Sequence, residues 1–290
     1  MERIFATLLC LVFLVGEPLA APAKPAPKND AIFEAAEQGK LPVIRKFLAG
    51  GGKANAADAS NLTLLNWAAY GGSLEVATLL VDKHADVNAH ANKAGWTPLM
   101  NASARGFPLV AAYLLDHGAD LNILSEQGYS ALAYATVEQH AGVMKLLLER
   151  GADGGNALSQ MAKMKELAAV ILLLDNGVDV NATPRTKEKW FTPGEGALYA
   201  AASVNAADIV SLLLDKGAAV EIPRPEASNM STPLMMGAYF CNGPMIDALL
   251  AHGASRSVTN AKGETAAQLA ATGWTNDMKP CADEITAKLQ

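Results

Sequence analysis

Apolar and polar positions follow a long-period pattern along most of the chain. Each period ends with a pair of leucines, a few polar residues and then Gly-Ala. We take this Gly, or the residue that replaces it, as the marker of the period. Between these Gly markers the spacings are 33, 34, 33, 26, 40 and 36 residues, and the two irregular values together make two periods of 33. A repeat of about 33 residues therefore organises the chain. The markers are Gly51, His84, Gly118, Gly151, Gly177, Gly217 and Gly253.

Each period predicts two short helices. A segment of constant length, 21 residues, precedes every marker, whereas the links between segments vary from 5 to 19 residues. The constant part must be a packed unit and the variable part an exposed connection, where changes in length cost little. One unit cannot bury its apolar face alone, so the units must stack into an all-α solenoid of about eight units with divergent ends. The units start near residues 30, 63, 97, 130, 156, 196, 232 and 265.

Local signals within a unit agree with this division. Thr97 or Ser130 can cap a first helix, and Pro98 stands in its first turn, where no amide donor is lost. The leucine pairs form the core face of the second helix. Gly118 and Gly151 are placed to end that helix in a left-handed conformation.

The N-terminus resembles a targeting segment. Residues Ile4 to Gly16 form an apolar run of 13 residues, shorter than the roughly 18 of a membrane span and of the length of a signal-peptide core. Small residues follow, so we expect cleavage after Ala20 or Ala21, with Ala23 as an alternative. Residues 1–21 are predicted to be a signal peptide, and a buried N-terminal helix is the alternative. Residues 22–28 (PAKPAPK) predict an extended tether.

These repeats resemble ankyrin repeats. The family pattern T-P-L-H-x-A-A-x-x-G, followed by a helix ending L-L-x-x-G-A-D-x-N, is matched by TPLMNASARG (97–106) and LLDHGADLN (114–122). The resemblance covers about residues 29–290 and implies helix-turn-helix units joined by short hairpin-like links. Three departures stand out. The His is replaced by Asn66, Met100 and Met235, the fifth unit lacks most of its preceding hairpin, and an irregular insertion occupies 184–195.

Few residue patterns in the sequence indicate chemistry. The chain has 23 basic and 29 acidic residues, a net charge of −6, and this acidic balance argues against nucleic-acid binding. No HExxH, GxSxG, CxxC or EF-hand pattern occurs in the sequence, and the five histidines are spread over different units. We therefore predict no metal, no cofactor and no enzymatic activity.

Cys241 and Cys281 could form a disulfide in an oxidising compartment, which would stabilise the fold by roughly 4 kcal/mol, or they could remain buried thiols. Cys281 is expected just ahead of a final helix, 282–289.

A partner-binding surface follows from the resemblance, since the family binds proteins at the concave side of hairpin tips and first helices. The alternative is that the aromatic rings cover their own hairpins, and that the insertion fills the gap left by the missing one. The residues that map to the concave side, with two aromatics of the insertion, are Leu62, Tyr70, Lys93, Trp96, Arg105, Glu126, Gln127, Tyr129, Glu138, Trp190 and Phe191.

The sequence thus predicts an exported, non-catalytic protein-binding scaffold, in a bacterial periplasm or secreted further, with no span in the mature chain and monomeric alone. Its expected partner is an envelope enzyme, which it would inhibit in an immunity or self-protection role. One alternative is a support factor for a periplasmic redox or stress enzyme. A small-ligand binder or an unrecognised enzyme is a further alternative.

Overall fold

The computed structural model describes residues 31–91, 94–185, 195–221, 232–272 and 279–290. Regular structure in these ranges consists of sixteen helices, with isolated antiparallel bridges but no strands. The helices alternate between the first and the second member of a pair, which confirms the predicted all-α repeat fold. The first helices are α2 (Ala31–Glu37), α4 (Leu64–Tyr70), α6 (Pro98–Ala104), α8 (Ala131–Val137), α10 (Gly154–Lys163), α12 (Ala197–Ser203), α14 (Pro233–Tyr239) and α16 (Ala266–Thr272). The second helices are α3 (Leu41–Ala49), α5 (Leu74–Asp82), α7 (Pro108–Asp116), α9 (Ala141–Glu149), α11 (Leu167–Asp175), α13 (Ala207–Asp215), α15 (Gly243–Ala251) and α17 (Lys279–Leu289).

Capping residues fix where several of the first helices begin. Thr63, Thr97, Ser130 and Thr232 are N-caps with extended backbone, and each side-chain oxygen accepts the amide N–H three residues on, at 3.2–3.3 Å. This contact satisfies one of the amides that a helix start leaves open. The short first helices therefore have sharp beginnings that the sequence dictates.

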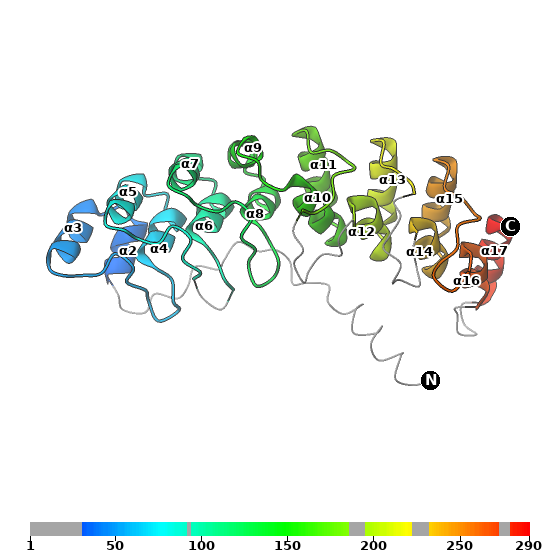
Figure 1. The fold of residues 1–290 in the computed structure, drawn as a ribbon, viewed down its shortest axis with the longest axis horizontal. Helices are drawn as coiled ribbons and strands as arrows, with labels where there is room; N and C mark the ends of the chain where they lie inside the picture. The colour runs from blue at the N-terminus through cyan, green and yellow to red at the C-terminus, as the bar shows by residue number, and fades with distance from the viewer. Residues whose placement is uncertain (1–30, 92–93, 186–194, 222–231, 273–278) are drawn as a thin grey trace. The chain divides into compact units, whose positions relative to one another are not determined.

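The helices form two compact units, residues 31–153 and 154–290. In the first unit, α4 packs between α2 and α6, and α6 packs against α8, while α5 and α7 lie in the parallel row of second helices (Figure 1). In the second unit, α10, α12, α14 and α16 form the corresponding row, and α17 packs against α16 and α14. None of the described helices is long and apolar enough to cross a bilayer. The core of each unit contains buried alanines, valines and methionines together with the recurring leucines. Among these leucines are Leu65, Leu80, Leu99, Leu114, Leu158 and Leu173, all essentially inaccessible.

An asparagine in the turn after the second helix links successive repeats. Asn55 accepts a hydrogen bond from the Asp86 amide at 2.8 Å and donates to the His84 carbonyl at 3.4 Å. Asn88 makes the same two contacts one repeat further on, and Asn181 makes them in the second unit. One side chain thus satisfies a donor and an acceptor of the neighbouring turn and connects the two repeats.

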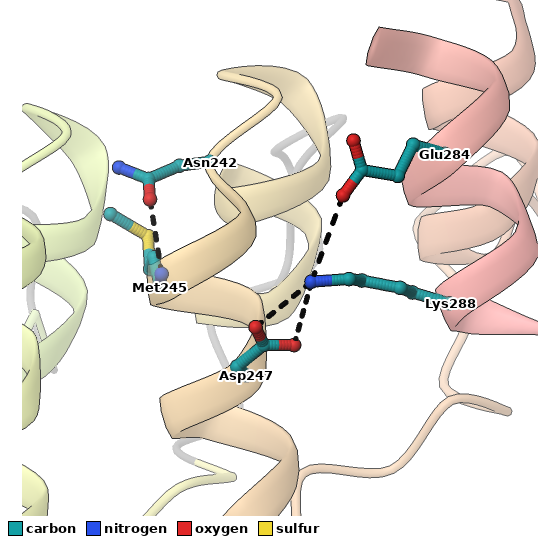
Figure 2. A network of polar contacts seen from close by, with 5 residues as sticks. All are labelled: Asn242, Met245, Asp247, Glu284 and Lys288. Carbon is teal, nitrogen blue, oxygen red and sulfur yellow. Dashed lines mark hydrogen bonds and ion pairs between the residues drawn. The ribbon is translucent and has the colours of Figure 1, made fainter.

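The last helix is fastened to its neighbour by an ion pair. Lys288 Nζ lies 2.9 Å from Asp247 Oδ2 on α15 and 3.9 Å from Glu284 Oε1 on its own helix (Figure 2). Asn242 caps α15 by accepting the Met245 amide at 3.0 Å. The expectation that Cys281 precedes the final helix is wrong, because α17 begins at Lys279 and contains it.

Candidate protein-binding surface

The hairpin before α4 is organised by one carboxylate. Asp58 Oδ1 accepts the amides of Ser60 and Leu62 at 2.8 and 2.9 Å, which closes the turn, and Asn61 at its tip has φ 65°. The second oxygen of Asp58 accepts the Trp67 indole N–H at 3.0 Å. The hairpin is therefore attached to the first helix of its own repeat, and local hydrogen bonds close its turn.

Leu62 and Trp96 do not lie on a free surface, so this part of the prediction is wrong. Leu62 is 8% exposed and Trp96 is 4% exposed. The Trp96 ring packs on the Tyr134 ring of α8 with centroids 4.0 Å apart, and its backbone pairs with Ala91. The next repeat covers the ring, so Trp96 stabilises the root of the hairpin and offers no atoms to a partner.

Tyr129 retains part of its surface. Its ring meets the edge of Tyr134 with centroids 5.9 Å apart, and this partial burial raises the pKa of Tyr129 above its ordinary value. The Tyr134 hydroxyl lies 3.2 Å from Ser125 Oγ, and burial raises the pKa of Tyr134 strongly. Trp96, Tyr134 and Tyr129 thus form one aromatic cluster, of which only Tyr129 is half-buried rather than buried.

Sequence reasoning missed Tyr134 as the centre of this cluster. A signal for it existed, because Tyr134 follows the cap Ser130 by the same four positions that separate Trp67 from Thr63. Both side chains reach back to a polar residue of their own hairpin, Asp58 for Trp67 and Ser125 for Tyr134.

The C-terminal ends of the first helices present a second group of predicted residues. The Arg105 guanidinium carbon lies 4.8 Å from the centroid of the Tyr70 ring, one repeat away, and Arg105 is exposed. Tyr70 is half-buried and meets the edge of Trp67 at 6.2 Å between centroids. Glu138 holds the position of Arg105 one repeat further on and is half-buried. A guanidinium that lies over an aromatic ring is positioned before any partner arrives.

The hairpin tip before α8 carries exposed polar groups. Glu126 and Gln127 are both exposed, and the Glu126 amide donates to the Ala94 carbonyl of the preceding hairpin at 2.9 Å. Lys93 lies outside the described residues. The surface that remains of the prediction comprises Tyr70, Arg105, Glu126, Gln127, Tyr129 and Glu138, and we call it the first-helix surface.

The insertion is anchored at both ends on α10. Glu195 is buried, with its Oε1 3.3 Å from Lys163 Nζ and its carbonyl accepting from Ser159 Oγ at 3.2 Å. At the other end, a Cβ placed on Gly155 would lie 2.7 Å from the Thr183 carbonyl oxygen, so the backbones are in close contact. Trp190 and Phe191 lie outside the described residues, so their proposed contacts stay a prediction.

Chemistry-bearing residues are dispersed over the described part of the chain. No group of three or more His, Cys, Asp or Glu side chains there could hold a metal ion. Cys241 follows α14 with φ 54°, and α14 packs against α17, the helix that contains Cys281.

Residues 8–91 and 89–157 match the family model "Ankyrin repeats (3 copies)". These segments cover more than half of the chain, and the chain therefore belongs to the ankyrin-repeat family. The fold of this family is generally non-catalytic, and ankyrin repeats mediate protein binding.

Individual relatives share only part of their length with this chain. It is 35% identical over 101 residues to ankyrin repeat and SAM domain-containing protein 6 of Rattus norvegicus, covering 34% of this chain and 11% of that protein. It is 31% identical over 193 residues to human ankyrin repeat and SOCS box protein 16, covering 67% of this chain and 37% of that protein. Among solved structures, the human ASB11 ankyrin repeat domain aligns with 90% of this chain and 98% of its own, at 24% identity and a TM-score of 0.42. The chain thus spans about a tenth to a third of the two named relatives.

Proposed function

We propose that this protein is a non-catalytic scaffold that binds another protein through the first-helix surface. The observation that carries the proposal is the exposed Arg105 guanidinium seated on the Tyr70 ring. Arg and Tyr are enriched among the residues that dominate interface energetics, and an ordered side chain loses less entropy on binding. The acidic and amide groups of Glu126 and Gln127 at the hairpin tip suit the polar rim of such an interface.

We further propose that the scaffold is exported and acts in the cell envelope. The support is the apolar run from Ile4 to Gly16, followed by small residues and the Pro/Ala-rich stretch 22–28. A disulfide between Cys241 and Cys281 would suit that compartment. Mass spectrometry of the protein isolated from an envelope fraction tests this proposal. A mature N-terminus at Ala21 or Pro22 is expected, and an intact Met1 in the isolated protein would contradict it.

The proposed partner is an envelope enzyme that the scaffold inhibits. Rigid repeats without catalytic groups can cover an active site, which fits an immunity or self-protection role. Support of a redox or stress enzyme is the alternative, and it predicts the opposite sign of effect. Assaying the captured enzyme with and without the scaffold separates the two, since inhibition lowers and support raises its rate.

Affinity capture with matched variants tests the surface itself. Tyr70→Ala/Arg105→Ala removes the ring and the guanidinium, and we expect at least a tenfold weaker capture of the partner. The control, Lys145→Ala/Glu149→Ala, removes an exposed ion pair on α9, in the row of second helices. If both variants capture the partner as the unmodified chain does, the first-helix surface is not the binding site.

A further inference from the structure

Helix α3 has an exposed face that differs from that of the other second helices. Its exposed residues lie on one side of the helix, while Ile44 on the opposite side is fully buried. The exposed side mixes apolar and basic residues, and Val43 is 45% exposed. Two more exposed lysines, Lys40 and Lys53, flank the helix. The exposed residues of α3 are Pro42, Val43, Arg45, Lys46 and Ala49.

The charge of this region opposes that of the rest of the chain. Residues 38–57 contain four basic residues and no acidic one, whereas the other 270 residues hold 19 basic and 29 acidic residues. The second helices from α5 to α15 each carry an exposed acid, and several of these pair with a cation of the next repeat, as in Asp116–Arg150 at 2.7 Å and Asp247–Lys288 at 2.9 Å. Within the described residues, none of the four cations around α3 has an ion-pair partner.

Helix stability does not explain this cluster. Lys46, in the last turn, interacts favourably with the helix dipole. Lys40 stands at the N-cap, where a positive charge is unfavourable and where its side chain makes no capping hydrogen bond. Helix stability therefore does not account for the four cations, all of which are exposed.

From this charge complementarity we infer that the α3 face docks the protein on an anionic lipid surface. Four basic residues on and around a helix that also exposes apolar side chains are typical of binding to anionic headgroups. The acidic remainder of the chain would be repelled by the same surface, so only the end of the first unit that carries α3 can approach it. The apolar side chains exposed beside the cations, Pro42 and Val43, favour a membrane over a soluble acidic protein, because a bilayer interface accepts apolar groups as well as cations.

Vesicle sedimentation tests the inference. The chain from Pro22 to Gln290 is used, because the apolar run would itself bind lipid, and all described helices lie in this form. We compare Arg45→Gln/Lys46→Gln with the control Lys83→Gln/Lys262→Gln, which removes two exposed lysines elsewhere. Each basic residue near an anionic surface contributes about a factor of five, so the first variant should bind phosphatidylglycerol vesicles about 25-fold more weakly. The control should change less than threefold, and 0.5 M salt should abolish binding, since it shortens the screening length to about 4 Å.

Three results would overturn the inference. Failure of the unmodified chain to bind anionic vesicles more tightly than neutral phosphatidylcholine vesicles would remove the charge argument. An equal loss in both variants would show that total charge, and not the α3 face, governs binding. Stronger binding to soluble polyglutamate than to anionic vesicles, lost in Arg45→Gln/Lys46→Gln, would assign the face to an acidic macromolecule. Neither variant alters the first-helix surface, so failure here leaves the proposed scaffold function untouched.

Discussion

The substitution Trp96→Ala tests whether Trp96 at the root of the hairpin contributes to the stability of the fold. The ring is 4% exposed and packs 4.0 Å from Tyr134, so truncation removes a buried aromatic side chain and leaves a cavity beside a second ring. Substitutions of this kind cost about 3–5 kcal/mol, and the lost aromatic pair falls within that range. We expect the free energy of unfolding of the first unit to fall by about 3 kcal/mol.

Urea unfolding followed by circular dichroism measures this loss. With a slope of about 2–3 kcal/mol per molar urea, 3 kcal/mol moves the midpoint of the affected transition by about 1 M. Tyr129→Ala is the matched comparison, because Tyr129 belongs to the same cluster but is only half-buried, and about 1 kcal/mol is expected. A loss below 1 kcal/mol for Trp96→Ala would refute the packing of Trp96 on Tyr134.

Three further predictions concern caps, a close backbone contact and the cysteines. In the same urea assay, Thr97→Ala should lower the free energy of unfolding by about 1 kcal/mol. Thr97→Ser should lower it by much less, because Ser keeps the capping oxygen. Equal losses in the two variants would contradict the cap. Gly71→Ala should lower the thermal midpoint of the first unit by several degrees, because its Cβ would overlap the Glu37 carbonyl; an unchanged midpoint would contradict that approach. If Cys241 and Cys281 are bonded, non-reducing mass spectrometry will give a mass two hydrogens lower, and dithiothreitol will lower the thermal midpoint; free thiols in the exported protein would refute the bond.

Local signals in the sequence were sufficient to predict the repeat and its helix pairs. A cap such as Thr97 and a terminal glycine such as Gly118, φ 89°, act within a few residues, so their consequences are visible without the fold. The burial of Trp96 is different, since its neighbour Tyr134 comes from the following repeat. The position of Trp96 before T-P-L predicts that it lies in a hairpin. Whether its side chain is exposed depends on Tyr134, which comes 38 residues later in the chain.

The difference between a buried residue such as Trp96 and an exposed one such as Arg105 decides which substitutions report on partner binding. If Trp96 were substituted to test partner capture, weaker capture could result from a destabilised hairpin as easily as from a lost contact with the partner. Arg105 is exposed, and its seat on Tyr70 is a surface interaction worth about 0.5–1 kcal/mol, so its removal leaves the core of the repeat in place. A tenfold loss of capture in an Arg105→Ala variant with an unchanged urea midpoint would therefore identify a contact. The same loss with a midpoint shifted by about 1 M would identify only a damaged fold.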